Sequence, residues 1–345
     1  MHENYYTEND LREIYVDLNA GENVNFRVGR QQVTWGELGQ YRLLDVVNPV
    51  NSTYHFASLE SFEDIRIPLW IVKGLVDIPA MEGALEIVWV PMLDNPEDTV
   101  NTPLTFVGAW GLPPTPQQNT NSDMEIKRKT FLYPDQDIEN SRIGARWKGT
   151  LGDLTYNLVY YYTHQLTPPV PTKYVARYEG HATGKVQDEV EVFLEYPRQH
   201  IMGFSLDYTF NHPIGTVVRL ESSFEPNRTF PVSSDVLRVN NAELYEDSWT
   251  YFETHQKRVV NTGIQLMRPT FIRFLNPNQT IMLIGQVMHS WVIDYNKDDS
   301  IIDVPGFDST ATNEHSLTLV FSAFTYYFHG LVMPRFIAAY IPSKS

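Results

Sequence analysis

Hydrophobic and polar residues alternate along much of the chain. Within 141–150, Ile143 and Trp147 share one parity, and polar or small residues take most positions of the other. The alternation continues through 154–164, after a glycine-containing turn at 151–153 that is typical of a tight hairpin connection. A period of two predicts strands with one apolar and one wet face, so these two segments form a predicted β-hairpin.

Roughly a dozen such segments occur, mostly ~8–12 residues long, which is about the length of a barrel strand that crosses a membrane. Tight turns alternate with long polar connections, an asymmetry that is typical of outer-membrane barrels. We therefore predict an all-β fold, an antiparallel transmembrane β-barrel of about 14 to 16 strands when complete, with long loops on one rim. Further alternating segments lie at 14–18, 24–28, 190–196, 203–210, 216–224, 259–266 and 316–324, and the long connections lie at 94–102, 113–129, 167–187, 230–249 and 296–313.

The two faces of the predicted strands separate this reading from a soluble β-sandwich or propeller, which also alternates. Charged residues in mid-strand, such as Arg146 and Arg219, suit a water-filled lumen, and tyrosine and tryptophan near strand ends suit interfacial girdles. The alternative is a secreted or periplasmic all-β protein that binds or cleaves carbohydrate. The barrel predicts lipid-facing positions for Trp147, Tyr156, Tyr160, Phe204, Leu206, Tyr208, Leu220, Leu319 and Phe321.

Composition narrows the function classes further. The chain has 345 residues, 13% of them aromatic, yet its mean hydropathy is −0.30, as expected when a polar lumen offsets an apolar outer face. Cysteine is absent, which excludes disulfides, thiolate metal sites and cysteine catalysis. A net charge of −16 argues against nucleic acid as a partner. No apolar run approaches the ~18–20 residues that a membrane-spanning helix needs.

Motifs of known chemistry are also missing. The sequence holds neither H-E-x-x-H, nor G-x-S-x-G, nor a complete Walker loop. Two acidic clusters could bind calcium or serve glycoside hydrolysis, but a solvated loop and a wet strand face explain them more simply. We expect no cofactor, no metal and no enzymatic activity. The clusters are Asp294, Asp298 and Asp299, and Glu189, Glu191 and Glu195.

The most distinctive stretch, 26–37, reads FRVGRQQVTWGE. With 44–50 and 68–93, it resembles a family of proteobacterial outer-membrane β-barrel proteins of unknown function. That family carries an R-x-G-R-Q-x-x-x-W-G-E signature followed by an I-N-P-x-D element, whose acid is replaced here by Asn51. Residues 326–334 are similar to a late hairpin of the same family. The signature positions in this chain include Gly29, Arg30, Trp35, Gly36, Asn48 and Pro49.

The resemblance implies a location and partners. Members reside in the Gram-negative outer membrane, surrounded by its lipid. The resemblance further implies transport or export of a hydrophobic or lipid-like solute, together with a periplasmic lipoprotein and an inner-membrane exporter of the resistance-nodulation-division type. Members carry a signal peptide and usually end on an aromatic residue, and the sequence given has neither, so we expect a single barrel domain, 1–345, truncated at both ends.

Parity assigns the signature residues to faces. Arg27, Gln31 and Glu37 share a parity that we predict to face the lumen, where carboxylates and guanidinium groups could form a network. Arg30 has the opposite parity, which requires a position beyond the apolar band or a bulge near Gly29. Alternatively, the signature braces an inward-folded loop at 45–64 and binds nothing.

The predicted function is a non-enzymatic channel or export component. Its candidate site residues are those that would face the lumen and set the field and the width of a pore. They are Arg27, Gln31, Glu37, Arg142, Arg146, Lys148, Asp207, Arg219 and Glu221.

Overall fold

A computed structural model describes most of the chain. The residues it describes are 11–39, 43–51, 62–101, 126–166, 170–177, 189–211, 215–232, 249–251, 254–302 and 312–342.

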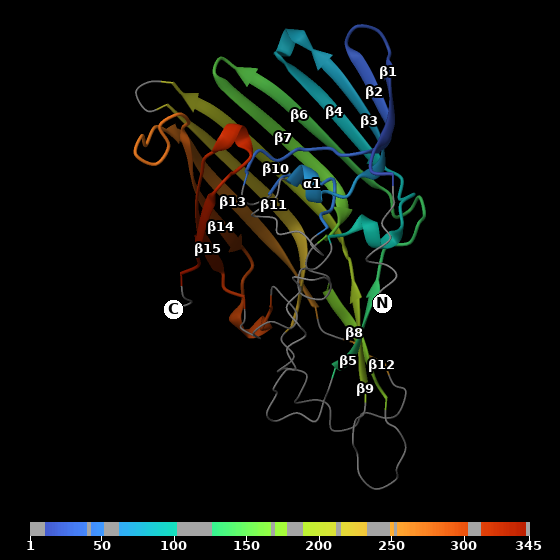
Figure 1. Cartoon of the computed structure of the whole chain (residues 1–345). Coiled ribbons are helices and arrows are strands. Elements are labelled where there is room, and N and C mark those ends of the chain that lie inside the picture. Colours follow the sequence, from blue (N-terminus) through green and yellow to red (C-terminus); the bar gives the residue numbers. More distant parts are fainter. Residues whose placement is uncertain are drawn as a thin grey trace.

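The dominant element is a twelve-stranded sheet that curves as a barrel wall does (Figure 1). Neighbouring strands are antiparallel throughout. Among the described residues, no pairing joins the first strand to the last, so the wall has a seam between β1 and β16. In order, the strands are β1 (Ile14–Asn19), β2 (Val24–Gln31), β3 (Leu69–Ile78), β4 (Gly83–Val90), β6 (Arg142–Leu151), β7 (Leu154–His164), β10 (Arg198–Phe210), β11 (Thr216–Pro231), β13 (Thr254–Thr270), β14 (Ile281–Val292), β15 (His315–Phe324) and β16 (Arg335–Tyr340).

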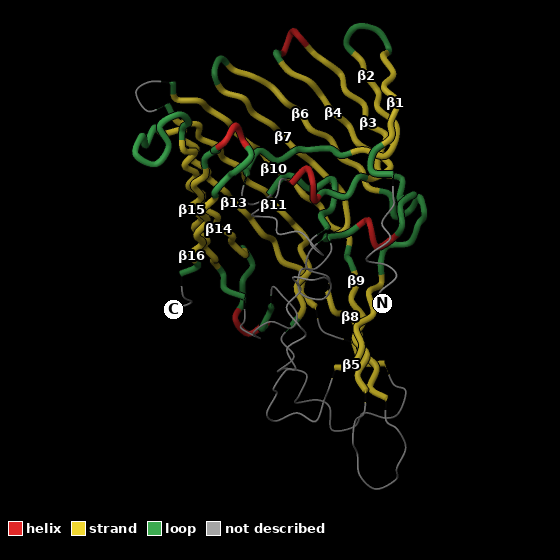
Figure 2. Tube along the Cα trace, viewed as in Figure 1, coloured by secondary structure: helices red, strands yellow, loops and turns green. Residues whose placement is uncertain are grey.

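Short and long connections alternate along this sheet. Short connections join β1 to β2, β3 to β4, β6 to β7, β10 to β11, β13 to β14 and β15 to β16, whereas the intervening connections are long. Figure 2 shows several of the short turns together at the upper end of the sheet, and the described parts of the long connections begin at the other ends of the strands. The predicted all-β antiparallel fold with long loops on one rim is therefore confirmed.

A second, four-stranded sheet lies among the long connections, at the bottom of Figure 1. Its order is β12 (Trp249–Tyr251), β8 (Val170–Arg177), β9 (Glu189–Glu195) and β5 (Ile126–Leu132), and β5 pairs with β9 in parallel. The alternating segment 190–196 was expected in the barrel wall and belongs almost entirely to β9 of this sheet. Alternation reports that a strand has two different faces, not which sheet it joins.

The helical elements are short. They are α1 (Phe62–Ile65) and the 3₁₀ turns η1 (Pro79–Met81), η2 (Pro96–Thr99), η3 (Lys297–Asp299) and η4 (Phe328–Gly330). No helix in the described part of the chain is long and apolar enough to cross a membrane.

The two faces of the main sheet differ as the alternation predicts. Of the nine side chains expected to face lipid, four are exposed, five are partly exposed and none is buried in a closed core. Outward apolar residues also follow one another across strands, as in the register Leu206, Leu220, Ile264, Val287 and Leu319. The inner face instead buries polar side chains: Glu86, Asn157, Ser205, Glu221, Gln265, Gln286 and Ser322.

The hydrophobic core lies inside the curve of the sheet. Val33, Trp35, Leu44 and Val47, all from the connection between β2 and β3, pack there against inward residues of β3, β4, β7 and β10. Trp35 meets the ring of Tyr161 edge-on, with ring centroids 5.6 Å apart. The core therefore forms between this connection and the inner face of the sheet.

Candidate functional site

The candidate site is the part of the β2–β3 connection that enters the barrel. We call the described residues 32–39 and 43–51 the interior segment. In Figure 1 it runs as a dark-blue trace from β2 across the curve of the sheet. It forms little regular structure, so its backbone N–H and C=O groups need partners from elsewhere. Inward side chains of the strands provide many of them.

Glu221 on β11 is one anchor of the interior segment. This fully buried carboxylate accepts backbone N–H groups from Leu38 at 3.1 Å, from Leu44 at 3.3 Å and from Glu37. On the next strand, the Gln265 side chain accepts the N–H of Gly39 at 3.0 Å. A carboxylate can accept hydrogen bonds from several donors, so this one side chain holds two separate stretches of the interior segment, at 37–38 and at 44.

Arg219 lies two residues before Glu221 on the same face of β11 and also binds the interior segment. Its Nη1 donates to the carbonyl oxygen of Glu37 at 3.0 Å, and its Nε pairs with Asp207 on β10 at 2.7 Å. The Glu37 carboxylate lies 3.8 Å from Lys148 on β6. Carboxylates and cations are thus paired around the interior segment, but Arg27, which parity had grouped with Glu37, pairs with Asp17 instead.

Glu86 on β4 is the second anchor. It accepts the indole N–H of Trp35 and lies 3.4 Å from Arg146, which also donates to the carbonyl oxygen of Thr34 at 3.0 Å. Lys73 on β3 lies 4.0 Å from the same carboxylate. Sequence reasoning missed Glu86; the signal was available, since it is the one charged residue in the strand GALEIVWV.

Asn48 and Asp45 fix the far end of the interior segment. Asn48 accepts the N–H of Val33 at 2.7 Å and donates to the carbonyl oxygen of Ile67 at 2.9 Å. Asp45 pairs with Arg66, whose Nη2 lies 2.6 Å from the carboxylate. Gly36 packs against Asp45 so closely that a Cβ there would meet its backbone nitrogen at 2.8 Å. Pro49, which follows Asn48, accepts the N–H of Ile67 through its carbonyl oxygen at 2.9 Å.

Gly29 and Arg30 occupy the strand that precedes the interior segment. Gly29 has a φ of +144°, and a Cβ there would lie 2.2 Å from the carbonyl oxygen of Ile14, so only glycine lets β1 approach β2 this closely. Arg30 sits at the end of the strand and donates to the carbonyl oxygen of Pro68 at 3.2 Å. The signature positions therefore surround the place where the chain turns inward.

The nine predicted lumen residues lie on the inner side, but not all face water. Gln31, Arg142 and Glu221 are completely enclosed, and Arg142 donates to the carbonyl oxygen of Thr99. For these three, the expectation of a side chain lining an open pore does not fit their burial, because the interior segment and loops cover them. Lys148 stays exposed, and Arg27 pairs with Asp17 at 2.7 Å.

The inward-folded loop was expected at 45–64. The described part of the inward path begins earlier, directly after β2, and 52–61 lie outside the described residues. Because strand parity stops carrying information where the strand ends, the sequence pattern did not show where the chain leaves the wall.

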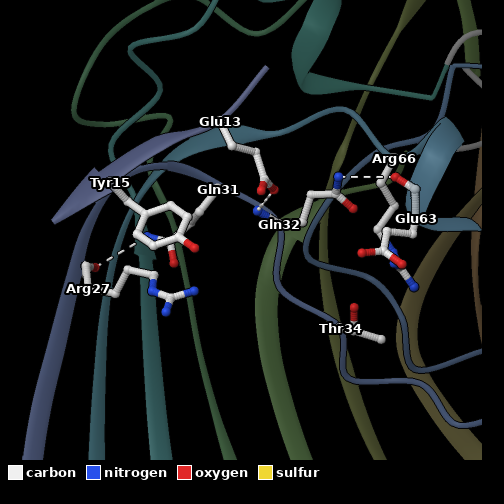
Figure 3. A pocket seen from close by; sticks show the side chains of 8 residues that line it. All are labelled: Glu13, Tyr15, Arg27, Gln31, Gln32, Thr34, Glu63 and Arg66. Carbon is white, nitrogen blue, oxygen red and sulfur yellow. Dashed lines mark hydrogen bonds between the residues drawn. The ribbon is translucent and has the colours of Figure 1, made fainter. Parts of the chain in front are cut away.

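A polar cavity of about 480 Å³ lies beside the start of the interior segment (Figure 3). Tyr15 of β1 and Arg27 of β2 form one side, and Gln32 and Arg66 lie toward the other. Arg27 places its guanidinium 3.9 Å from the centroid of the Tyr15 ring. Gln31, on β2, also lines the cavity.

The acids of the long-loop rim have protein partners. Asp294 pairs with Arg258, and Asp299 pairs with Lys257, so this cluster does not need calcium to balance its charge. The described residues contain no group of three or more His, Asp or Glu side chains placed to hold a metal.

In η2, burial raises the pKa of Asp98 to about 6, an effect partly opposed by Arg30.

Comparison with known proteins gives one structural neighbour and one family. A solved structure titled as a porin refined at 1.8 Å resolution is similar over 96% of this chain and 76% of its own, with 8% identity and a TM-score of 0.40. No curated protein matches the sequence. The profile of the family described as protein of unknown function (DUF1302) matches residues 2–336. The chain therefore belongs to the DUF1302 family.

Proposed function

We propose that this protein is an outer-membrane β-barrel channel whose passage is narrowed by the interior segment. One observation carries the proposal. The main sheet exposes many apolar side chains on its outer face, and its inner face carries buried polar side chains beside the apolar core, whereas the exposed face of a soluble protein's sheet is mainly polar. Lipid would cover the apolar outer face, because the outer residues of a membrane barrel contact hydrocarbon while charged residues are tolerated in its interior.

The interior favours polar solutes. Charged side chains of β3, β4, β6, β10 and β11 lie on the inner side of the sheet, and apolar residues of the interior segment are packed away in the core. This distribution suits water and polar solutes better than the hydrophobic or lipid-like solute that the family resemblance implies. We propose separately that the barrel interacts with a periplasmic lipoprotein and an inner-membrane exporter. Crosslinking in cells tests whether these proteins contact it.

Membrane fractionation and planar-bilayer recording test the channel. The chain should fractionate with the outer membrane, migrate differently on gels before and after heating, and conduct ions when reconstituted. Recovery of a folded, detergent-free monomer from the soluble fraction would refute the barrel and favour the alternative, a secreted or periplasmic β-protein that binds or cleaves carbohydrate. A membrane-inserted barrel without conductance would refute only the channel.

A further inference from the structure

We propose that two neighbouring connections at the short-turn end of the sheet bind anionic phospholipid headgroups. Residues 271–280 join β13 to β14, and 325–334 join β15 to β16. The Tyr327 hydroxyl donates to the carbonyl oxygen of Leu275 at 2.7 Å, and the Asn276 amide donates to the Thr325 hydroxyl at 2.9 Å. We call these two connections the loop pair; both lie at the upper end of the sheet in Figure 1. Lipid binding at the loop pair requires the membrane barrel proposed above, but not its conductance.

The loop pair exposes a cluster of large apolar side chains. Phe274 is 86% exposed and Leu331 is 87% exposed, and these are the two most exposed large apolar side chains in the described part of the chain. Clustered apolar side chains at a surface mark contact with another protein or with a membrane. The other exposed apolar residues of the loop pair include Phe271, Leu275, Phe328, Val332 and Met333.

The charge around the loop pair favours an anionic occupant. Asp and Glu account for 42 of the 345 residues, yet none lies in 254–293 or in 315–345, the stretches that contain β13 to β16 and the whole loop pair. Arg268 and Arg273 are exposed there. This side of the rim is therefore basic, although the net charge of the protein is −16. By contrast, acids occur in the connections of β1 to β2, β3 to β4 and β6 to β7, namely Glu22, Glu82 and Asp153.

The loop pair continues the outer apolar face, which favours lipid over a protein as the occupant. Ile264, Leu266 and Arg268 occupy successive outward positions of β13. Apolar side chains thus give way to a guanidinium group as the strand ends, which is the order expected where hydrocarbon meets phosphate headgroups. On β16, close to the second connection, the exposed ring of Phe336 lies 6.4 Å from that of Phe321, measured between centroids. A protein bound here would have to displace the lipid that covers the adjoining strands.

Lipid retention tests the preference for negative charge. The full-length protein would be refolded into nanodiscs of equal phosphatidylcholine and phosphatidylglycerol, and the lipids that stay bound after release would be counted by native mass spectrometry. We expect phosphatidylglycerol to be retained about tenfold over phosphatidylcholine, and Arg268→Gln and Arg273→Gln each to reduce that ratio about threefold. Arg258→Gln is the matched control, because Arg258 lies at the opposite end of β13 and pairs with Asp294. Equal retention of both lipids, or an equal reduction in Arg258→Gln, would overturn the proposal.

A fluorescent label on the loop pair tests its contact with the bilayer. Because the chain has no cysteine, Phe274→Cys takes a single environment-sensitive dye, and Leu331→Cys repeats the measurement in the second connection. In vesicles that contain phosphatidylglycerol, emission from both positions should shift to the blue, and brominated lipids should quench it. Asp153→Cys, in the acidic connection of β6 to β7, is the control and should keep the emission of a dye in water.

Three results would refute lipid binding at the loop pair. They are water-like emission from both labelled positions, an equal blue shift in Asp153→Cys, and a shift that appears in native membranes but not in vesicles of pure lipid. The last result would identify a protein as the occupant.

Planar-bilayer conductance of the same protein separates lipid binding from the channel. Retention of phosphatidylglycerol without conductance would refute the channel and keep the lipid site. Conductance with equal retention of both lipids would refute the lipid site and keep the channel. Recovery of a folded, detergent-free monomer from the soluble fraction would refute both, because each requires the membrane barrel.

Discussion

Replacing Glu221 with glutamine tests whether one carboxylate holds the interior segment. Glutamine keeps one acceptor oxygen for Glu37 and Leu38 but presents an NH₂ group to the N–H of Leu44. Two charge-assisted bonds become neutral, at about 1 kcal/mol each, and the buried N–H left unpaired costs about 1–3 kcal/mol. Relief of the buried charge offsets part of this sum. We expect the hold on the segment to weaken by about 3 kcal/mol, roughly a hundredfold in the population of released segment.

Single-channel conductance in planar bilayers measures that release. Glu221→Gln should show a larger or more frequently open conductance than wild type, while strand pairing, read by heat-modifiable migration, stays intact. Glu225→Gln is the matched control, because this partly buried carboxylate on the same strand bonds to Gln199 and Asn261. Identical conductance in Glu221→Gln and wild type, or an equal increase in Glu225→Gln, would refute the anchoring role.

Four further substitutions test the rim, the outer face and the lumen. Because burial raises the pKa of Asp98 to about 6, folded protein should lose stability as pH rises through that value, and urea unfolding of Asp98→Asn should not show this loss. Leu206→Arg places a charge in hydrocarbon and should cost ~2–4 kcal/mol near the midplane in bilayer unfolding measurements. Asp207→Asn should cost no more than about 1 kcal/mol, since its pair with Arg219 is partly exposed; equal costs would contradict a lipid-facing Leu206. Lys148→Gln, at an exposed inner position, should shift the reversal potential toward cation selectivity, and an unchanged potential would remove Lys148 from the ion path.

Local pattern was sufficient for the strands of the wall. The predicted hairpin at 141–164 corresponds to β6 and β7, and the segment 154–164 has the bounds of β7. The predicted outward parity also held, because a side chain's face follows directly from its position in a strand. Strand ends were less predictable. For example, β11 continues to Pro231, past a register shift between Glu225 and Arg228 that interrupts simple alternation.

Long-range contacts explain what the sequence did not reveal. The bonds from Glu221 join residues 177 to 184 positions apart, and the bond from Trp35 to Glu86 spans 51. Nothing local distinguishes Glu221, which becomes an anchor, from Glu191, which lies in the small sheet. Both lie in segments of alternating polarity, and only the three-dimensional path of the interior segment separates their roles.

The wall and the interior segment are held by different kinds of hydrogen bond. Adjacent strands hold one another through backbone ladders, whereas the interior segment is held largely by side chains: Glu86, Arg146, Arg219, Glu221 and Gln265. Releasing the segment therefore breaks none of the ladder bonds that stabilise the wall. It does expose Trp35 and its apolar neighbours to the lumen, which disfavours full release. The geometry thus favours partial displacement near Glu37–Gly39, where the side chains of Glu221 and Gln265 hold the backbone N–H groups, over expulsion of the whole segment.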